Sequence, residues 1–113
     1  MKVLVVEGDD AVLKAAGIML NKLGYKVGLA SNCDEALRIS SEEGPHDVVL
    51  IAMKFLNSAA AGGGKFMDAL RQKDSQQKFG FMTGTPVLKK PFSIQELDDF
   101  MGAFRRPASS RFG

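Results

Sequence analysis

Two short runs of consecutive apolar residues constrain the fold most strongly. They occupy residues 3–6 and 48–52, and the strand that contains the later run begins at Asp47, so we place it at 47–52. A strand with one face in water alternates apolar and polar residues, whereas an unbroken apolar run indicates a strand covered on both faces. Such strands belong mainly to parallel sheets with helices on either side. We therefore expect an α/β domain.

The rest of the chain alternates strand patterns with helix patterns. Further strands are expected at residues 25–30, 79–83 and 87–89. Apolar residues recur three or four positions apart in the other segments, which is typical of helices with one buried face. Strands that alternate with helices indicate a doubly wound, mainly parallel sheet, here with five strands.

The helix boundaries follow from capping residues and glycines. The residues expected to start or stop helices are Asp9 or Asp10, Gly24, Ser31, Gly44, Pro45 and the capping box at 93–96. The residues expected to face inward are Val12, Ala16, Met19 and Leu23; Ala36, Leu37 and Ile39; Phe66, Met67 and Leu70; and Ile94, Leu97, Met101 and Phe104. Each set follows the spacing of one helix face.

Length and composition restrict the function classes. The 113 residues suffice for one domain, which we place at residues 1–104, followed by a tail at 105–113 that we expect to be disordered. A net charge of +2 is too small to indicate a nucleic-acid partner. The single Cys33 excludes an internal disulfide and suits a reducing compartment. No apolar stretch is long enough to span a membrane, so we expect a cytoplasmic protein.

Four strand ends carry the residues that indicate a family. The first strand is followed by Glu7-Gly8-Asp9-Asp10, the third ends at Ala52, the fourth ends at Thr83, and the fifth is followed by Lys90-Pro91-Phe92. In this order they resemble the receiver domain of two-component response regulators, over roughly residues 2 to 104. The resemblance implies a flavodoxin-like fold and a role in phosphorelay signal transduction.

The resemblance also implies what each strand end does. Acids after the first strand hold Mg²⁺, an aspartate at the end of the third accepts the phosphoryl group, and Thr83 and Lys90 respond to it. Here the acceptor position is Ala52, whose methyl group cannot be phosphorylated, and the second acid is replaced by Gly8. We therefore expect no metal, no cofactor and no catalytic residue, which describes a pseudo-receiver.

The vestigial site is expected to comprise Glu7, Asp9, Thr83 and Lys90. We expect Lys90 either to form a salt bridge with Glu7 or to be simply exposed. Asp9 caps the first helix or belongs to the acid cluster, and Thr83 is a switch hydroxyl or a structural one. Asp47 cannot replace the acceptor, because it starts its strand and lies at the opposite edge of the sheet.

The predicted function is phosphorylation-independent binding of a signalling protein, without enzymatic activity. The alternative is a small phosphate- or nucleotide-binding protein, or an enzyme, that uses the glycine-rich loop 62–65 with Lys65 or Lys90. The phosphate-loop motif would need glycine at Ala59 and Ser or Thr at Phe66, so a flexible loop is the preferred interpretation. His46 is expected at the surface, and Cys33 is expected to be a small residue in the opening turn of the second helix.

The connection between the fourth and fifth strands is unusually short. Only Gly84, Thr85 and Pro86 separate Thr83 from Val87. They can span roughly 14 Å, whereas a return to the start of a parallel neighbour must cover about 17–20 Å. The helix that receivers place here is therefore missing. Either the fifth strand turns back as a hairpin, or the chain forms a homodimer by a domain swap of residues 87–104. The interface candidates are Phe81, Gly84, Thr85, Pro86, Val87 and Phe92.

Overall fold

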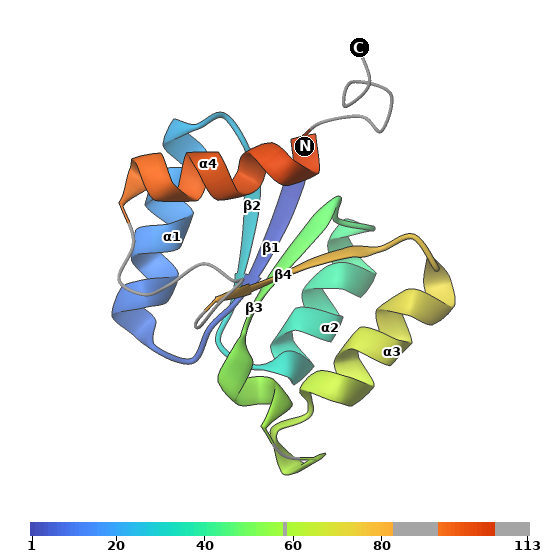
Figure 1. Cartoon of the computed structure of the whole chain (residues 1–113). Coiled ribbons are helices and arrows are strands. Elements are labelled where there is room, and N and C mark those ends of the chain that lie inside the picture. The colour runs from blue at the N-terminus through green and yellow to red at the C-terminus, as the bar shows by residue number, and fades with distance from the viewer. Residues whose placement is uncertain (58, 83–92, 106–113) are drawn as a thin grey trace.

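The chain forms a parallel sheet with helices on both faces (Figure 1). The computed structural model describes residues 1–57, 59–82 and 93–105. The described strands are β1 (Lys2–Val6), β2 (Lys26–Ala30), β3 (Val48–Ala52) and β4 (Lys78–Met82). Their order is β2-β1-β3-β4, and every pair is parallel. This confirms the doubly wound, flavodoxin-like α/β fold, within which four strands are described.

Among the described residues, two helices cover each face of the sheet. On one face lie α1 (Asp10–Lys22) and α4 (Ile94–Arg105), which contact each other, and on the other lie α2 (Cys33–Glu43) and α3 (Gly63–Lys73) (Figure 1). Two short 3₁₀ helices, η1 (Met53–Leu56) and η2 (Ala59–Ala61), connect β3 to α3. No helix among the described residues is long and apolar enough to cross a membrane.

The central strands contribute to two separate hydrophobic cores. Val3, Val5, Val48 and Leu50 pack with α1 and α4, while their neighbours along the same strands pack with α2 and α3. Every residue of β3 is buried. This arrangement explains why residues 3–6 and 48–52 are apolar without alternation, because successive side chains point into different cores.

The inward face of α1 differs from the prediction. Leu13, Ala16 and Leu20 are buried, whereas Met19 and Leu23 are only partly buried at the edge of the same core, and Val12 is half-buried. Both sets have helical spacing and share Ala16. Periodicity therefore could not decide between them, and the position of α1 against the sheet and α4 did.

The caps are mostly as predicted. Asp9 caps α1, and Gly24 and Gly44 follow the ends of α1 and α2 with φ of 95° and 85°, which favour glycine. The prediction that Ser31 opens α2 is wrong by one residue. Asn32 is the cap, with its Oδ1 accepting from the Glu35 amide at 2.8 Å, while the Ser31 amide donates to the Glu35 carboxylate.

The start of α4 follows the predicted capping box. The Ser93 hydroxyl accepts from the Glu96 amide at 3.1 Å, and the Glu96 carboxylate accepts from the Ser93 amide at 3.0 Å. Leu97 and Met101 are fully buried as predicted, but Ile94 is 38% exposed because it lies in the first turn, at the edge of the core. The predicted fifth strand at 87–89 and the short connection before it lie outside the described residues, as do residues 106–113 of the predicted tail.

Candidate functional site

The fold brings Glu7 and Ala52 to the same edge of the sheet. Val6 of β1 is aligned with Ile51 of β3, so the residues that follow them emerge side by side. The Glu7 amide donates to the Ala30 carbonyl of β2 at 3.0 Å. Ala52 is 1% exposed and is aligned with Met82 of β4. The edge contains the carboxyl ends of all four described strands, where α/β folds place their ligand sites. Thr83 and Lys90 lie outside the described residues.

Glu7 is a fully buried acid held by its own loop and by a lysine. One of its carboxylate oxygens, Oε1, accepts from the Asp9 amide at 2.9 Å. The same oxygen lies 3.6 Å from the Nζ atom of Lys54, whose side chain is 52% exposed. The described contacts of this acid therefore include a peptide donor and a positive charge.

Lys54 is the residue that sequence analysis missed at this edge. Ala52 is extended, with φ −68° and ψ 135°, and is the N-cap of η1. That short helix turns the chain back over the strand ends, which brings Lys54 beside Glu7. Its position two residues after the buried run could have indicated that Lys54 lies near the site. Residues that follow a parallel strand lie near the residues that follow the neighbouring strands. The predicted pairing of Glu7 with Lys90 stays a prediction.

Gly8 leaves room for the head of Lys54. A Cβ atom on Gly8 would lie 2.7 Å from Lys54 Nζ, closer than Cβ contacts in real proteins, and a tight 3.0 Å from Lys54 Cε. The φ angle of Gly8 is outside the left-handed region, so the backbone does not itself require glycine here. The absence of a side chain at residue 8 and the position of Lys54 are therefore linked.

The next two acids serve the helix that they begin. Asp9 Oδ1 accepts from the amides of Ala11 and Val12 at 3.0 and 3.3 Å. Asp10 pairs with Lys14 at 3.4 Å, one turn along the exposed face of α1. Within the described ranges, no three His, Cys, Asp or Glu residues are grouped so that they could hold a metal ion.

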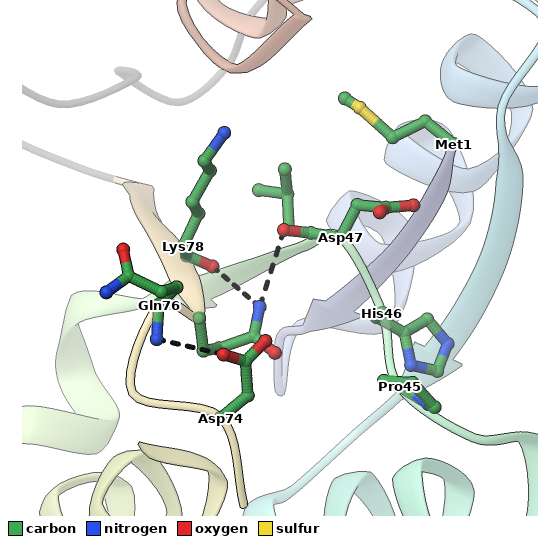
Figure 2. Close-up of a pocket in the computed structure, with 9 residues that line it drawn as sticks. Met1, Pro45, His46, Asp47, Asp74, Gln76 and Lys78 are labelled. Carbon is green, nitrogen blue, oxygen red and sulfur yellow. Dashed lines mark hydrogen bonds between the residues drawn. The ribbon is translucent and has the colours of Figure 1, made fainter. Parts of the chain in front are cut away.

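The opposite edge of the sheet contains Asp47, where the sequence placed it. Its Oδ2 accepts from the Lys2 amide at 2.7 Å, which ties the start of β3 to the start of β1. Figure 2 shows Asp47 on the wall of a polar pocket of about 360 Å³, with Asp74, Gln76 and Lys78 across from it. Asp47 therefore lies a strand length away from Ala52.

His46, expected at the surface, is buried, with only 5% of the residue exposed. It fits because Gly28 on β2 has no side chain: a Cβ atom there would lie 3.3 Å from His46 Nε2. Burial, and secondly the positive charge of Lys2, lower the pKa of His46. Its Nδ1 atom has no hydrogen-bond partner in the described part of the chain. The space left by a glycine on β2 cannot be recognised from the sequence around residue 46.

The glycine-rich segment 62–65 has structural reasons for its glycines. Gly62 has φ 81°, which favours glycine. A Cβ atom on Gly63 would collide with the carbonyl group of Phe55, so α3 can begin beside η1 only with glycine there. The flexible loop preferred for residues 62–65 is wrong, because residues 63–65 form the first turn of α3, and residues 59–61 before them form the short helix η2. Lys65 lines a pocket of about 350 Å³ between the starts of α2 and α3.

Two further predicted residues lie near the helices α2 and α3. Cys33 lies in the first turn of α2, as predicted, and the structure buries it; this burial and, secondly, the charge of Asp34 raise the pKa of its thiol. Phe81, an interface candidate, is partly buried against the core beneath α2 and α3. The remaining interface candidates lie outside the described residues.

Comparison with solved structures decides what the fold is. The receiver domain of the hybrid histidine kinase CckA matches with a TM-score of 0.76 and 24% identity, over 94% of this chain and 100% of that one. The chemotaxis response regulator CheY4 of Vibrio cholerae matches with a TM-score of 0.75 and 22% identity, over 91% and 97%. The chain has the fold of a receiver domain.

A third match supports the receiver-domain fold over the full length. It is the N-terminal domain of a response regulator/sensory box/GGDEF 3-domain protein from Carboxydothermus hydrogenoformans, with a TM-score of 0.75 and 21% identity over 100% of both chains. No protein-family model and no curated protein sequence matches this chain. The predicted receiver-like, flavodoxin-like fold is thus confirmed by structure, at identities that show the fold alone.

The receiver-domain resemblance implies Mg²⁺ at the carboxyl edge, and the described residues do not fit that ion. Mg²⁺ requires about six oxygen ligands in near-octahedral geometry, usually with one or two carboxylates from the protein. At this edge the structure places the carboxylate of Glu7, the backbone of Gly8, the methyl group of Ala52 and the ammonium group of Lys54. An ammonium group only donates hydrogen bonds and repels a second cation, so this donor set is unsuited to a divalent metal.

Proposed function

We propose that this receiver-like domain is a non-enzymatic signal-transduction module that binds a partner protein without being phosphorylated. The observation that carries the proposal is Ala52, a buried methyl group at the end of β3. Phosphoryl transfer needs a nucleophile at the acceptor position and, in receivers, a metal ion that neutralises the developing charge. Ala52 offers no nucleophile, and the group around Glu7 offers a poor metal site. The proposal includes a cytoplasmic location, for which the single buried Cys33 is suited.

The phosphate-binding alternative has less support. Gly62 and Gly63 are accounted for by a positive φ angle and by the carbonyl of Phe55, so their presence does not require a ligand. Lys65 follows them at the start of α3, but the serine or threonine that a phosphate loop places after the lysine is replaced by Phe66, which is buried.

Phosphodonor treatment tests the proposal. The protein is incubated with acetyl phosphate and MgCl₂, and its intact mass and amide NMR spectrum are recorded before and after. We expect no added phosphate and no shift of the amides of Glu7 or Lys54 beyond that produced by sodium acetate and MgCl₂. A stoichiometric adduct of about 80 Da, the mass of a phosphoryl group that adds a charge of about −2, would overturn the proposal.

The variant Ala52→Asp separates the two defects of the site. It supplies the nucleophile but leaves Gly8 and Lys54 unchanged. We expect it to remain largely unphosphorylated, because the metal ligands are still incomplete. Rapid and complete phosphorylation of this variant would show that the site retains a working metal centre, and that the loss of function rests on Ala52 alone.

A further inference from the structure

We propose that the ammonium group of Lys54 takes the place of a divalent cation at the carboxyl edge, so that the acid pocket contains a cation belonging to the chain itself. The inference concerns which cation the pocket holds. It is independent of the partner that the domain binds and of whether that binding depends on phosphorylation.

The first support is the position of the charge. Glu7 is fully buried, and a buried carboxylate is costly unless a positive charge and hydrogen-bond donors surround it. Lys54 Nζ lies 3.6 Å from Glu7 Oε1, while the Asp9 amide donates to the same oxygen. A cation is therefore present where the acid needs one, and it is covalently tethered.

The second support is the space that this cation occupies. Lys54 Nζ lies 2.7 Å from the place of a Cβ atom on Gly8. Gly8 is the position at which the receiver resemblance implies a second acid. An acid there and the observed position of Lys54 exclude each other, although the backbone of Gly8 could accommodate a side chain. We infer that Gly8 and Lys54 form a matched pair. Residue 8 supplies no carboxylate, and the ammonium group of Lys54 occupies the space that a side chain at residue 8 would need.

The third support is the way in which Lys54 is held. It belongs to η1, which turns directly from the end of β3, and its Nζ also lies 5.7 Å from the centre of the Phe55 ring. A cation over an aromatic ring is attracted by the negative face of the ring. Because the side chain is about half exposed, its head can leave without unfolding the domain, which makes the proposal testable by substitution.

Mn²⁺, a paramagnetic probe for hard divalent sites, tests the proposal in a matched pair of variants. Gly8→Asp restores an acid and retains Lys54, whereas Gly8→Asp with Lys54→Met restores the acid and removes the ammonium. We expect the double variant to bind Mn²⁺ at least tenfold more tightly, seen as saturable broadening of the amide signals of residues 7–9. We expect the wild-type protein to show none at the same Mn²⁺ concentration. Equal affinity of the two variants, or equally tight binding by the wild-type protein, would overturn the proposal.

A control and a measurement on the unaltered protein complete the test. Gly8→Asp with Lys14→Met removes a lysine from the exposed face of α1 instead, and should bind Mn²⁺ no more tightly than Gly8→Asp alone. In the wild-type protein, nuclear Overhauser contacts are expected between the Lys54 Hε protons and the Gly8 Hα protons. Their absence would overturn the proposal even if no variant folds, because the tethered cation must lie against Gly8.

Discussion

Lys54 Nζ lies 3.6 Å from the buried Oε1 atom of Glu7, which joins the turn after β3 to the end of β1. The two residues are far apart in the sequence and meet only because β1 and β3 are parallel neighbours. The ion pair therefore depends on the parallel pairing of β1 with β3 at the carboxyl edge.

A double-mutant cycle should detect this ion pair. The substitutions are Glu7→Gln and Lys54→Met, alone and together, with the free energy of unfolding measured in urea. We expect a coupling energy of about 1 kcal/mol, because one partner is buried and the other is half exposed. A coupling energy of zero within error would contradict the pairing. A parallel cycle with Lys90→Met tests the partner that the sequence predicts for Glu7.

Gly63 and Gly64 form a matched pair of neighbours at the start of α3. We expect Gly63→Ala to destabilise the domain by several kcal/mol, because its Cβ atom would collide with the Phe55 carbonyl group and the backbone of η1 would have to move. Gly64→Ala has open space around its Cβ atom and should be neutral or stabilise by about 0.5 kcal/mol through helix propensity. Thermal unfolding of both variants measures the contrast. Similar effects of the two substitutions would show that η1 and α3 are packed differently.

His46 should make stability depend on pH in the mildly acidic range. Its pKa in the folded state is lowered from the ordinary 6.5 by burial. Between the folded pKa and about pH 6.5, His46 is therefore protonated in the unfolded chain but neutral in the folded domain. The free energy of unfolding falls as pH decreases through this interval, and this residue does not affect it at higher pH. The slope contributed by one histidine is at most about 1.4 kcal/mol per pH unit.

The variant His46→Gln isolates this contribution. Urea unfolding of wild type and variant is compared from pH 7.5 to pH 5. The difference between their free energies of unfolding should change across the lower part of this range and be constant above pH 7. A constant difference throughout would mean that His46 can accept a proton in the folded domain, through a partner or through access to water.

Homodimerisation by exchange of residues 87–104 remains a prediction from the short connection after Thr83. In this single chain, α4 packs against α1 through a core that includes Leu13, Leu97 and Met101. Exchange would preserve these contacts, with α4 supplied by a second copy. Light scattering across a dilution series should give twice the chain mass of 12.2 kDa. A mass equal to that of one chain at high micromolar concentration would exclude the dimer.

A linker insertion separates exchange from simple association. Adding about a dozen flexible residues after Gly84 would let residues 87–104 return to their own sheet at small entropic cost. We expect this variant to be monomeric. A variant that remains fully dimeric would indicate that two folded domains associate through their surfaces.

The strand-end motifs were visible in the sequence because they are local. Each motif involves residues that are close along the chain, such as the apolar run that ends at Ala52. The same holds for the capping box at Ser93. The structure places both of these motifs as predicted. The alternation of strand and helix predicted a parallel sheet, because a crossover between parallel strands usually contains a helix. The order β2-β1-β3-β4 came from the structure.

The sequence by itself therefore determined the α/β class, the receiver-like order of elements and the lack of an acceptor at residue 52. Only the tertiary structure decided that Lys54 faces Glu7, that α1 buries Leu13 and Leu20, and that His46 lies under Gly28. These facts depend on the space between elements that are distant in sequence. A glycine on one strand or loop leaves space that a side chain from a distant element fills. The sequence around neither residue indicates that the two will meet.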